Sequence, residues 1–312
     1  MLAPIILFVY NRPKHTSATL QALAANDLAN ESVIYIYADG AKENATPIDL
    51  KKIDDTRQVI KQHQWCKEVH IILSVSNNGL ANSVINGVTQ IVNQYGKVIV
   101  LEDDLVTSKG FLKYMNDALL KYNDAEQVMQ ISAHCFPIKN RKRKGEAFFL
   151  PFTTSWGWGT WQDAWGKFDV TATGYEQLKT DIELKQKFDI DGTYPYAEMI
   201  INQMEKKNID SWAIRWWWSV FKNKGIVLFP DKSLVDNIGF DNEGTHTNTV
   251  NPFAILDFDT NYFIVNFPDK PVVNRAFFEK VKFTIFSLIY KKKPDAIIAR
   301  IYSFTGKLKK LF

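Results

Sequence analysis

Residues 98–105 read Val-Ile-Val-Leu-Glu-Asp-Asp-Leu, a run of strand-forming residues that stops on three consecutive carboxylates. Its apolar part, residues 98–101, has the continuous hydrophobic character of a central strand in a parallel sheet. Ligands of open α/β sheets bind just outside the carboxyl ends of such strands. Three neighbouring acids repel one another unless a cation or hydrogen-bond donors lie between them. The stretch therefore predicts a cation site after a buried strand; an acidic turn capping a helix near Ser108 is the alternative.

Strand and helix signals alternate through the first 135 residues. Strands are expected at residues 4–10, 33–38, 69–75, 98–101 and 128–132, and helices at 15–25, 49–62, 81–95 and 109–122. Alternation at this spacing is typical of βαβ units on a parallel sheet. The predicted fold class is therefore α/β, with a mostly parallel, Rossmann-like sheet flanked by helices.

Polar residues follow four of these strands. The segments are Asn11-Arg12-Pro13, Asp39-Gly40, Asn77-Asn78-Gly79 and Glu102-Asp103-Asp104. Arg12 could pair with a phosphate or stack on a base, and Asp39 could accept from a nucleobase or a ribose hydroxyl. Each segment alone also suits an ordinary turn. Because the carboxyl ends of parallel strands meet at one edge, the four together predict a ligand site there.

The composition bounds the class of protein. Hydrophobic residues make up 46% of the 312 residues and charged residues 23%, which is typical of a soluble globular protein. No run approaches the roughly 18 apolar residues that a membrane span needs. Residues 3–10 lack a basic leader and are expected to form a strand and not a signal peptide. Cys66 and Cys135 show neither a disulfide framework nor zinc-ligand spacing, so a cytoplasmic location is the expectation.

Tryptophan gathers in the second half of the chain, which holds eight of the nine residues of this type. Each one buries a large area and needs a partner for its indole N–H. The cluster predicts either a packed lobe or a face that stacks on sugar rings. The change of character near residue 135 predicts a division into residues 1–135 and residues 136–278.

The last segment, residues 279–312, carries nine basic side chains against two acidic ones. Its net charge of +7 leaves −3 for the rest of the chain, since the total is +4. The cations are interleaved with apolar and aromatic residues, which predicts a basic amphipathic tail that contacts an anionic membrane surface. A helix packed on the domain is the alternative. Nucleic acid is disfavoured as a partner because the remainder is slightly acidic.

Several segments resemble one enzyme family. They are residues 4–13 (Pro-Ile-Ile-Leu-Phe-Val-Tyr-Asn-Arg-Pro), Ala38-Asp39-Gly40, Asn78-Gly79-Leu80-Ala81, residues 101–105, residues 154–161, and Asn237-Ile238-Gly239-Phe240 with Gly244-Thr245-His246. In this order they resemble nucleotide-sugar-dependent glycosyltransferases of the GT-A fold, most nearly the bacterial relatives of N-acetylglucosaminyltransferase I. The resemblance covers the chain from its start to about residue 250. It implies that residues 1–135 bind the nucleotide sugar and that residues 136–278 form the acceptor-binding and catalytic half of the same domain.

The resemblance implies a metal site at the acidic triplet. Asp104 would hold Mn²⁺ or Mg²⁺ that bridges the donor's diphosphate, while Glu102 and Asp103 would touch the ribose or the donor sugar. His246 would contact the diphosphate or the metal; an ordinary loop histidine is the alternative.

The resemblance also implies nucleotide-binding residues and a base. Asp39 would read the uracil edge, Arg12 would lie beside the base and the phosphate, and Asn78 belongs to the same nucleotide-binding set. The family's base is an Asp in a Trp-Asp-Asp-Trp-type segment, and Ile209-Asp210-Ser211-Trp212 is the best match, giving Asp210. The first Trp and the second Asp of that pattern are absent from this chain.

These expectations converge on a metal-dependent, inverting glycosyltransferase. It would move a sugar from a nucleotide sugar, a UDP-sugar, to a glycan or lipid-linked acceptor in surface polysaccharide synthesis. A sugar-phosphate nucleotidyltransferase is the first alternative; it would carry a Gly-rich, Arg-containing loop after strand one, whereas here the first glycine is Gly40. A non-catalytic glycan-binding protein with the same fold is the second.

Overall fold

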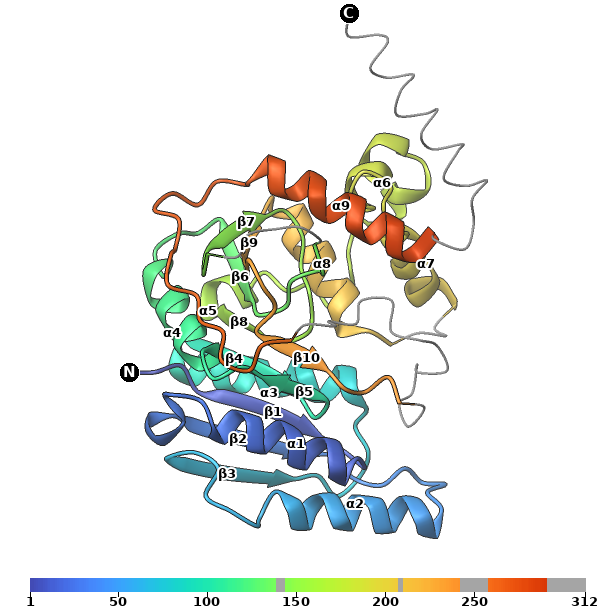
Figure 1. The fold of residues 1–312 in the computed structure, drawn as a ribbon. Helices are drawn as coiled ribbons and strands as arrows, with labels where there is room; N and C mark the ends of the chain where they lie inside the picture. Colours follow the sequence, from blue (N-terminus) through green and yellow to red (C-terminus); the bar gives the residue numbers. More distant parts are fainter. Residues whose placement is uncertain (139–143, 207–209, 242–257, 291–312) are drawn as a thin grey trace, which may run out of the picture.

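A mostly parallel sheet forms the centre of the structure. A computed structural model describes residues 1–138, 144–206, 210–241 and 258–290, and within them eight strands are ordered β3-β2-β1-β4-β8-β6-β9-β7 (Figure 1). Their bounds are β1 Ile5–Val9, β2 Val33–Ala38, β3 Glu68–Leu73, β4 Lys97–Glu102, β6 Val128–Ser132, β7 Ala147–Leu150, β8 Trp158–Trp161 and β9 Ile226–Pro230. Only β8 and β7 of these eight run against the common direction.

Helices cover the sheet. Their bounds are α1 Pro13–Ala24, α2 Pro47–Val59, α3 Leu80–Tyr95, α4 Phe111–Lys121, α5 Gln162–Trp165, α6 Ile182–Phe188, α7 Tyr196–Lys206, α8 Trp212–Lys222 and α9 Arg275–Tyr290, with short 3₁₀ turns η1 Ala29–Glu31 and η2 Tyr175–Lys179. α1 packs beside α2, whereas α3 lies on β1 and β4 and also contacts α5 and α8 (Figure 1). The predicted α/β class is therefore confirmed.

The early elements begin and end where local chemistry places them. Pro13 starts α1 because its fixed φ suits the first helical turn, where its missing N–H costs nothing. Thr46 and Asp49 form a reciprocal capping box at the start of α2. The predicted strands at 33–38 and 128–132 match β2 and β6 residue for residue. The other predicted strands and helices in this half end within three residues of the observed bounds.

In the first half of the chain one observed strand was not predicted, and no strands had been predicted in the second half, where β7 to β10 lie. β5 (Leu105–Thr107) directly follows the acidic triplet and pairs antiparallel with β10 (Val235–Asn237) in a separate two-stranded sheet. Three residues are too few to show a periodic pattern, so the signal was absent from the sequence. α4 starts only at Phe111 after Gly110, so the three acids lie outside its first turn. The alternative that they cap this helix is therefore wrong.

The tryptophan cluster forms a packed lobe. Seven of its eight indoles are buried: Trp158, Trp161, Trp165, Trp212, Trp216, Trp217 and Trp218. Partners for the N–H groups come from the chain itself; Trp161 donates to the Leu119 carbonyl and Trp165 to the Thr89 hydroxyl. Trp156 is the exception, because it is only half-buried. The packed-lobe interpretation is confirmed for the seven, and Trp156 keeps a face available for a ligand.

Helix α9 shows how the first part of the basic tail is used. Phe277, Val281 and Ile285 are buried against the domain, and Lys282 pairs with Glu279 at 2.7 Å and with Asp191 at 2.5 Å. For residues 279–290 the structure therefore shows the packing alternative. The remaining tail, residues 291–312, lies outside the described residues. Within the described chain, no helix is both long and apolar enough to cross a membrane.

Gln130 gives a test of the packing inside the lobe. It is completely buried in β6, donates to the Thr154 carbonyl at 2.8 Å and accepts from the Trp216 indole N–H at 2.6 Å. Gln130→Leu removes both hydrogen bonds and leaves the buried Trp216 N–H without a partner, which alone costs about 1–3 kcal/mol. We expect the free energy of unfolding to fall by about 2–4 kcal/mol in urea titrations. The exposed control Gln62→Leu should stay within about 0.5 kcal/mol of wild type.

Candidate functional site

The strand order brings Arg12 to the acidic triplet. β1 and β4 are neighbours in parallel, so the residues that follow them meet at the same edge of the sheet. Arg12 Nη1 lies 2.8 Å from Asp104 Oδ2 and 3.6 Å from Asp103 Oδ1. Burial works against the charge of Arg12, but the carboxylates of Asp103 and Asp104 outweigh it and raise the pKa of the guanidinium. We refer to Glu102, Asp103 and Asp104 as the acidic cluster.

The acidic cluster holds more negative charge than Arg12 balances. Burial, helped by the neighbouring carboxylates, raises the pKa of Glu102 to about 8. Burial and the Asp104 carboxylate likewise raise the pKa of Asp103 to about 7. Without a further cation, these two carboxyl groups therefore hold protons near neutral pH, because a buried carboxylate without countercharge is costly.

The segment after β10 closes over the cluster. The Ile238 N–H donates to the Asp104 carbonyl at 2.9 Å. A Cβ atom at position 239 would lie 2.3 Å from Asp104 Oδ2 and 3.1 Å from Arg12 Nη1, so only glycine permits this approach. One turn into α1, His15 Nε2 lies 3.0 Å from Asp241 Oδ2. Residues 237–240 belong to the motifs that carry the family resemblance, and in the structure they cover the cluster.

Asp39 ties the ends of β2 and β3 together. One carboxylate oxygen accepts from the N–H groups of Gly40 and Asn78, both at 2.9 Å. The other accepts from the Gly79 N–H at 3.1 Å and the Asn77 side-chain amide at 3.0 Å. All four lone-pair positions are therefore used within the chain. A nucleobase would have to share or replace one of these donors, so base reading by Asp39 stays a prediction.

The four predicted strand ends thus meet at one edge in two groups. Arg12 and the acidic cluster join β1 to β4, and the Asp39 turn joins β2 to β3. Asn78 sits in the second group, and its side chain donates to the Ser74 hydroxyl at 3.0 Å. His246 lies outside the described residues.

Asp210 lies at the start of α8, away from the sheet edge. Its Oδ1 is 2.9 Å from Arg215 Nη2, and its side chain is 62% exposed. The cap of α8 is Ser211, whose hydroxyl accepts from the Ile214 N–H at 3.4 Å. The Asp210 carboxylate is therefore not needed as a helix cap. Asp236 in β10 is a second acid of interest, because burial raises its pKa.

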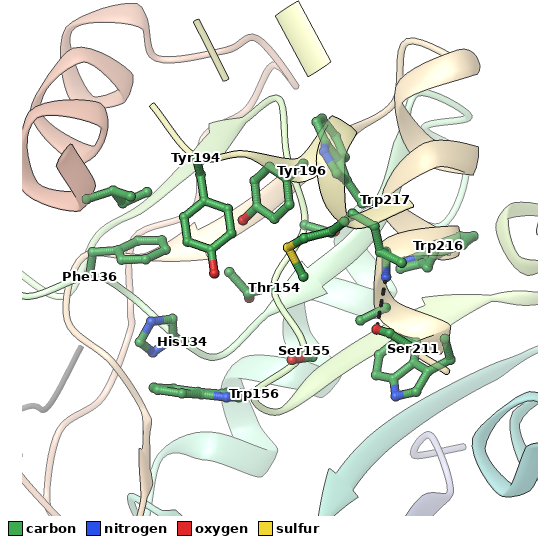
Figure 2. Close-up of a pocket in the computed structure, with 16 residues that line it drawn as sticks. His134, Phe136, Thr154, Ser155, Trp156, Tyr194, Tyr196, Ser211, Trp216 and Trp217 are labelled. Carbon is green, nitrogen blue, oxygen red and sulfur yellow. Dashed lines mark hydrogen bonds between the residues drawn. The ribbon is translucent and has the colours of Figure 1, made fainter. Parts of the chain in front are cut away.

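A cavity of about 270 Å³ opens between the loops that follow β6 and β7 and the helices α7, α8 and α9; we call it the aromatic pocket (Figure 2). Its wall includes the rings of Phe136, Trp156, Tyr194, Tyr196 and Trp217. Ser211 lies in the lining, directly beside Asp210. On another side the Trp156 ring meets Phe240 edge-on at 6.0 Å, and Phe240 follows the Gly239 that touches Asp104. The pocket therefore lies between Asp210 and the acidic cluster.

The acidic cluster suits a hard divalent cation that is only partly held by protein. Its donors are all carboxylate oxygens, and burial together with repulsion between neighbouring carboxylates raises the pKa of Glu102 and of Asp103. Among the described residues, no three His, Cys, Asp or Glu side chains form a complete metal-binding group. Mg²⁺ and similar ions are commonly held by one or two carboxylates plus phosphate oxygens and water. The residues therefore fit a cation that arrives with a phosphorylated ligand.

No protein-family model and no curated protein sequence matches the chain. Among solved structures it is similar to residues 1–349 of Staphylococcus aureus TarS, with a TM-score of 0.39 and 14% identity over 75% of this chain and 60% of that one. It is also similar to mouse xyloside xylosyltransferase 1 in its apo form, with a TM-score of 0.36 and 10% identity over 72% of this chain and 82% of that one. A third similar structure is that of galactosyltransferase LgtC with donor and acceptor sugar analogues. Its TM-score is 0.35 and its identity 8%, over 58% of this chain and 65% of that one. Because the chain spans only 25% of the longer TarS structure and the TM-scores are low, these likenesses assign no family to it.

Proposed function

We propose that the protein is a metal-dependent glycosyltransferase that moves a sugar from a nucleotide sugar, a UDP-sugar, to a glycan or lipid-linked acceptor. The observation that carries the proposal is the pairing of Arg12 with Asp103 and Asp104, next to Glu102, because one guanidinium does not balance three carboxylates. A divalent cation supplies the missing charge, and a diphosphate supplies the ligands that complete the cation's shell. The motifs that resemble GT-A glycosyltransferases support the same conclusion.

Each residue at the sheet edge would contact a different part of the nucleotide-sugar donor. Asp104 would ligate Mn²⁺ or Mg²⁺, and Glu102 and Asp103 would face the ribose or the donor sugar. A bound divalent ion neutralises charge on the departing diphosphate. Arg12 would turn from Asp104 towards a phosphate oxygen once the cation takes its place, since guanidinium binds both groups. Asp39 and Asn78 would contact the nucleoside, and His246 the diphosphate or the metal.

The acceptor would be activated by a carboxylate. In an inverting transfer, a base takes the proton of the acceptor hydroxyl while the oxygen attacks the anomeric carbon opposite the leaving diphosphate. Asp210 is the expected base, supported by its position beside the aromatic pocket and by Arg215, which orients its carboxylate. Asp236 is the second candidate because burial raises its pKa, which strengthens a base.

The two alternatives differ from this proposal in specific features. A nucleotidyltransferase needs a Gly-rich loop after β1, but only three residues separate Val9 from Pro13 at the start of α1. A glycan-binding protein without activity would not need an uncompensated acidic cluster. Metal-dependent hydrolysis of a UDP-sugar without acceptor separates the enzyme from that binding protein.

The location of the reaction extends the proposal. We expect the protein to act in the cytoplasm on surface-polysaccharide precursors. Because the apolar face of α9 is packed on the domain, peripheral contact with an anionic membrane is proposed for residues 291–312, which carry seven of the tail's nine cations. Phe283, which is 74% exposed on α9, would be available for the same contact.

Asp104→Asn tests the metal assignment. The variant should fold, but its affinity for UDP in the presence of Mn²⁺ should fall at least about tenfold, since even outer partners of metal sites are worth about 10–100-fold. Calorimetric titration with UDP, with and without Mn²⁺, measures this. The exposed control Asp54→Asn should bind as wild type does. Unchanged UDP affinity in Asp104→Asn would contradict the assignment.

The acidic cluster also predicts a pH dependence of stability. Unfolded Glu and Asp release their protons near their ordinary pKa values, whereas Glu102 and Asp103 keep theirs up to about pH 8 and about pH 7. The folded state therefore binds more protons, and the metal-free free energy of unfolding should fall as pH rises through this range. His134 makes the stability rise with pH, but only below its ordinary pKa of 6.5, because burial lowers its pKa in the folded state to about 3.

Urea unfolding between pH 6.5 and about pH 8.5 measures how the acidic cluster changes the free energy of unfolding. The lower limit is the ordinary pKa of histidine, above which His134 no longer contributes. Glu102→Gln should flatten the slope and raise stability at the upper end, and the exposed control Glu126→Gln should do neither. Added Mn²⁺ should flatten the wild-type slope. A wild-type stability that rises with pH over this interval would refute the prediction.

Paired variants identify the base. Asp210→Asn should lower the rate of sugar transfer by about 10²–10⁴, the usual contribution of a general base, with UDP affinity unchanged. If Asp210 is the base, Asp236→Asn should keep most of the wild-type rate of sugar transfer. If Asp210→Asn stays within about threefold of wild type while Asp236→Asn loses the rate, the base is Asp236. Melting temperatures of both variants show whether a loss of rate reflects unfolding.

A further inference from the structure

We propose that the aromatic pocket binds one uncharged sugar residue of the acceptor and excludes charged sugars. The proposal rests on the glycosyltransferase function argued above and adds the class of acceptor to it. Four features of the pocket support it: its aromatic walls, its neutral hydrogen-bonding groups, its lack of ionised side chains, and its size and position.

Aromatic rings face the pocket from two sides. Trp156 lies below it, in edge contact with His134 at 4.5 Å between ring centroids (Figure 2). Tyr194 and Tyr196 lie above, with centroids 4.6 Å apart. Indole and phenol rings have apolar faces together with polar edges, and a pyranose ring has the matching combination of C–H faces and hydroxyl edges. A pyranose ring inserted between these walls can therefore stack its C–H faces on the aromatic faces and form hydrogen bonds through its hydroxyl edges.

Neutral polar groups are available at the same place. Within the described part of the chain, the hydroxyls of Ser155 and Tyr196 have no hydrogen-bond partner, and both residues line the pocket. His134 contributes an imidazole that is uncharged, because burial lowers its pKa to about 3. Its Nδ1 is 3.4 Å from the Ser233 hydroxyl, which leaves Nε2 for a ligand. A lipid chain would not use these groups, whereas sugar hydroxyls would.

Charge is missing from the lining. None of the described residues around the pocket is an Asp, Glu, Lys or Arg. A carboxylate or phosphate placed there would lose its hydration without gaining an ionic partner, which is strongly unfavourable. Hydroxyls and N-acetyl groups keep neutral hydrogen bonds instead. The pocket should therefore distinguish a hexose from the uronic acid of the same ring size.

Size and position indicate a single acceptor residue. About 270 Å³ is near the lower limit of ligand pockets, about 300–1,000 Å³, so the space suits one ring and not a nucleotide. Ser211 places the pocket beside Asp210, and the contacts Trp156–Phe240 and Gly239–Asp104 connect it to the acidic cluster. A sugar bound here lies between the expected base and the expected donor site.

The test compares matched sugars on the full chain. Saturation-transfer NMR and calorimetry should detect saturable binding of methyl glucoside or N-acetylglucosamine, and binding of glucuronic acid at least about tenfold weaker. Equal binding of the neutral and charged sugars, no saturable sugar binding, or displacement of the methyl glucoside by uridine would overturn the proposal.

Substitutions locate the binding. Trp156→Leu and Tyr196→Phe should each weaken methyl glucoside binding, the first by roughly tenfold. Ser155→Lys should shift the preference towards glucuronic acid by adding a cation. Tyr37→Phe is the matched control, because the Tyr37 hydroxyl bonds Gln90 in the other half of the molecule. Wild-type sugar affinity in both Ser155→Lys and Tyr196→Phe would overturn the assignment even if Trp156→Leu does not fold.

A separate measurement distinguishes the two proposals. UDP is titrated into the same protein samples in the presence of Mn²⁺. Sugar binding without UDP binding would refute the glycosyltransferase proposal and support the pocket assignment. UDP binding without saturable sugar binding would support the donor site and refute the pocket.

Discussion

The contact between Arg12 and the carboxylates after β4 is the constraint on which the rest of the site depends. It exists because β1 and β4 are parallel neighbours, so that a cation after one strand meets the acids after the other. One guanidinium cannot balance three neighbouring acids, and the surplus negative charge, together with burial, raises the pKa values of Glu102 and Asp103 towards neutral pH. The glycine at position 239 and the β5–β10 pairing cover this charge without filling the space beside it.

Sequence patterns were sufficient for the first half of the fold. Continuous apolar runs gave β1, β2, β4 and β6, and helical periodicity gave α1 to α4, because burial on one face leaves a repeat that can be read locally. The convergence of polar residues on one edge followed from parallel strands alone. The pairing of Arg12 with Asp104 additionally required the order of the strands, which no local pattern contains.

The rest of the site depends on contacts between distant segments. β5 pairs with a strand about 130 residues later, and Gly239 matters only because it touches Asp104. Asp39 looked like a ligand residue, yet four internal donors surround its carboxylate. The tryptophans looked like a single group, but seven of the clustered eight are buried and Trp156 is only half-buried. Composition reveals that such residues exist, whereas tertiary packing determines which of them meet a ligand.

The position of β8 has a consequence for folding during synthesis. β8 lies between β4 and β6, although it follows both in the chain, and β10 must arrive before β5 has a partner. The emerging N-terminal half therefore exposes an unpaired β4 edge until residues 158–161 leave the ribosome. The acidic cluster is covered later still, after residue 239. Assembly of this edge of the sheet is thus a late event, coupled to completion of nearly the whole domain.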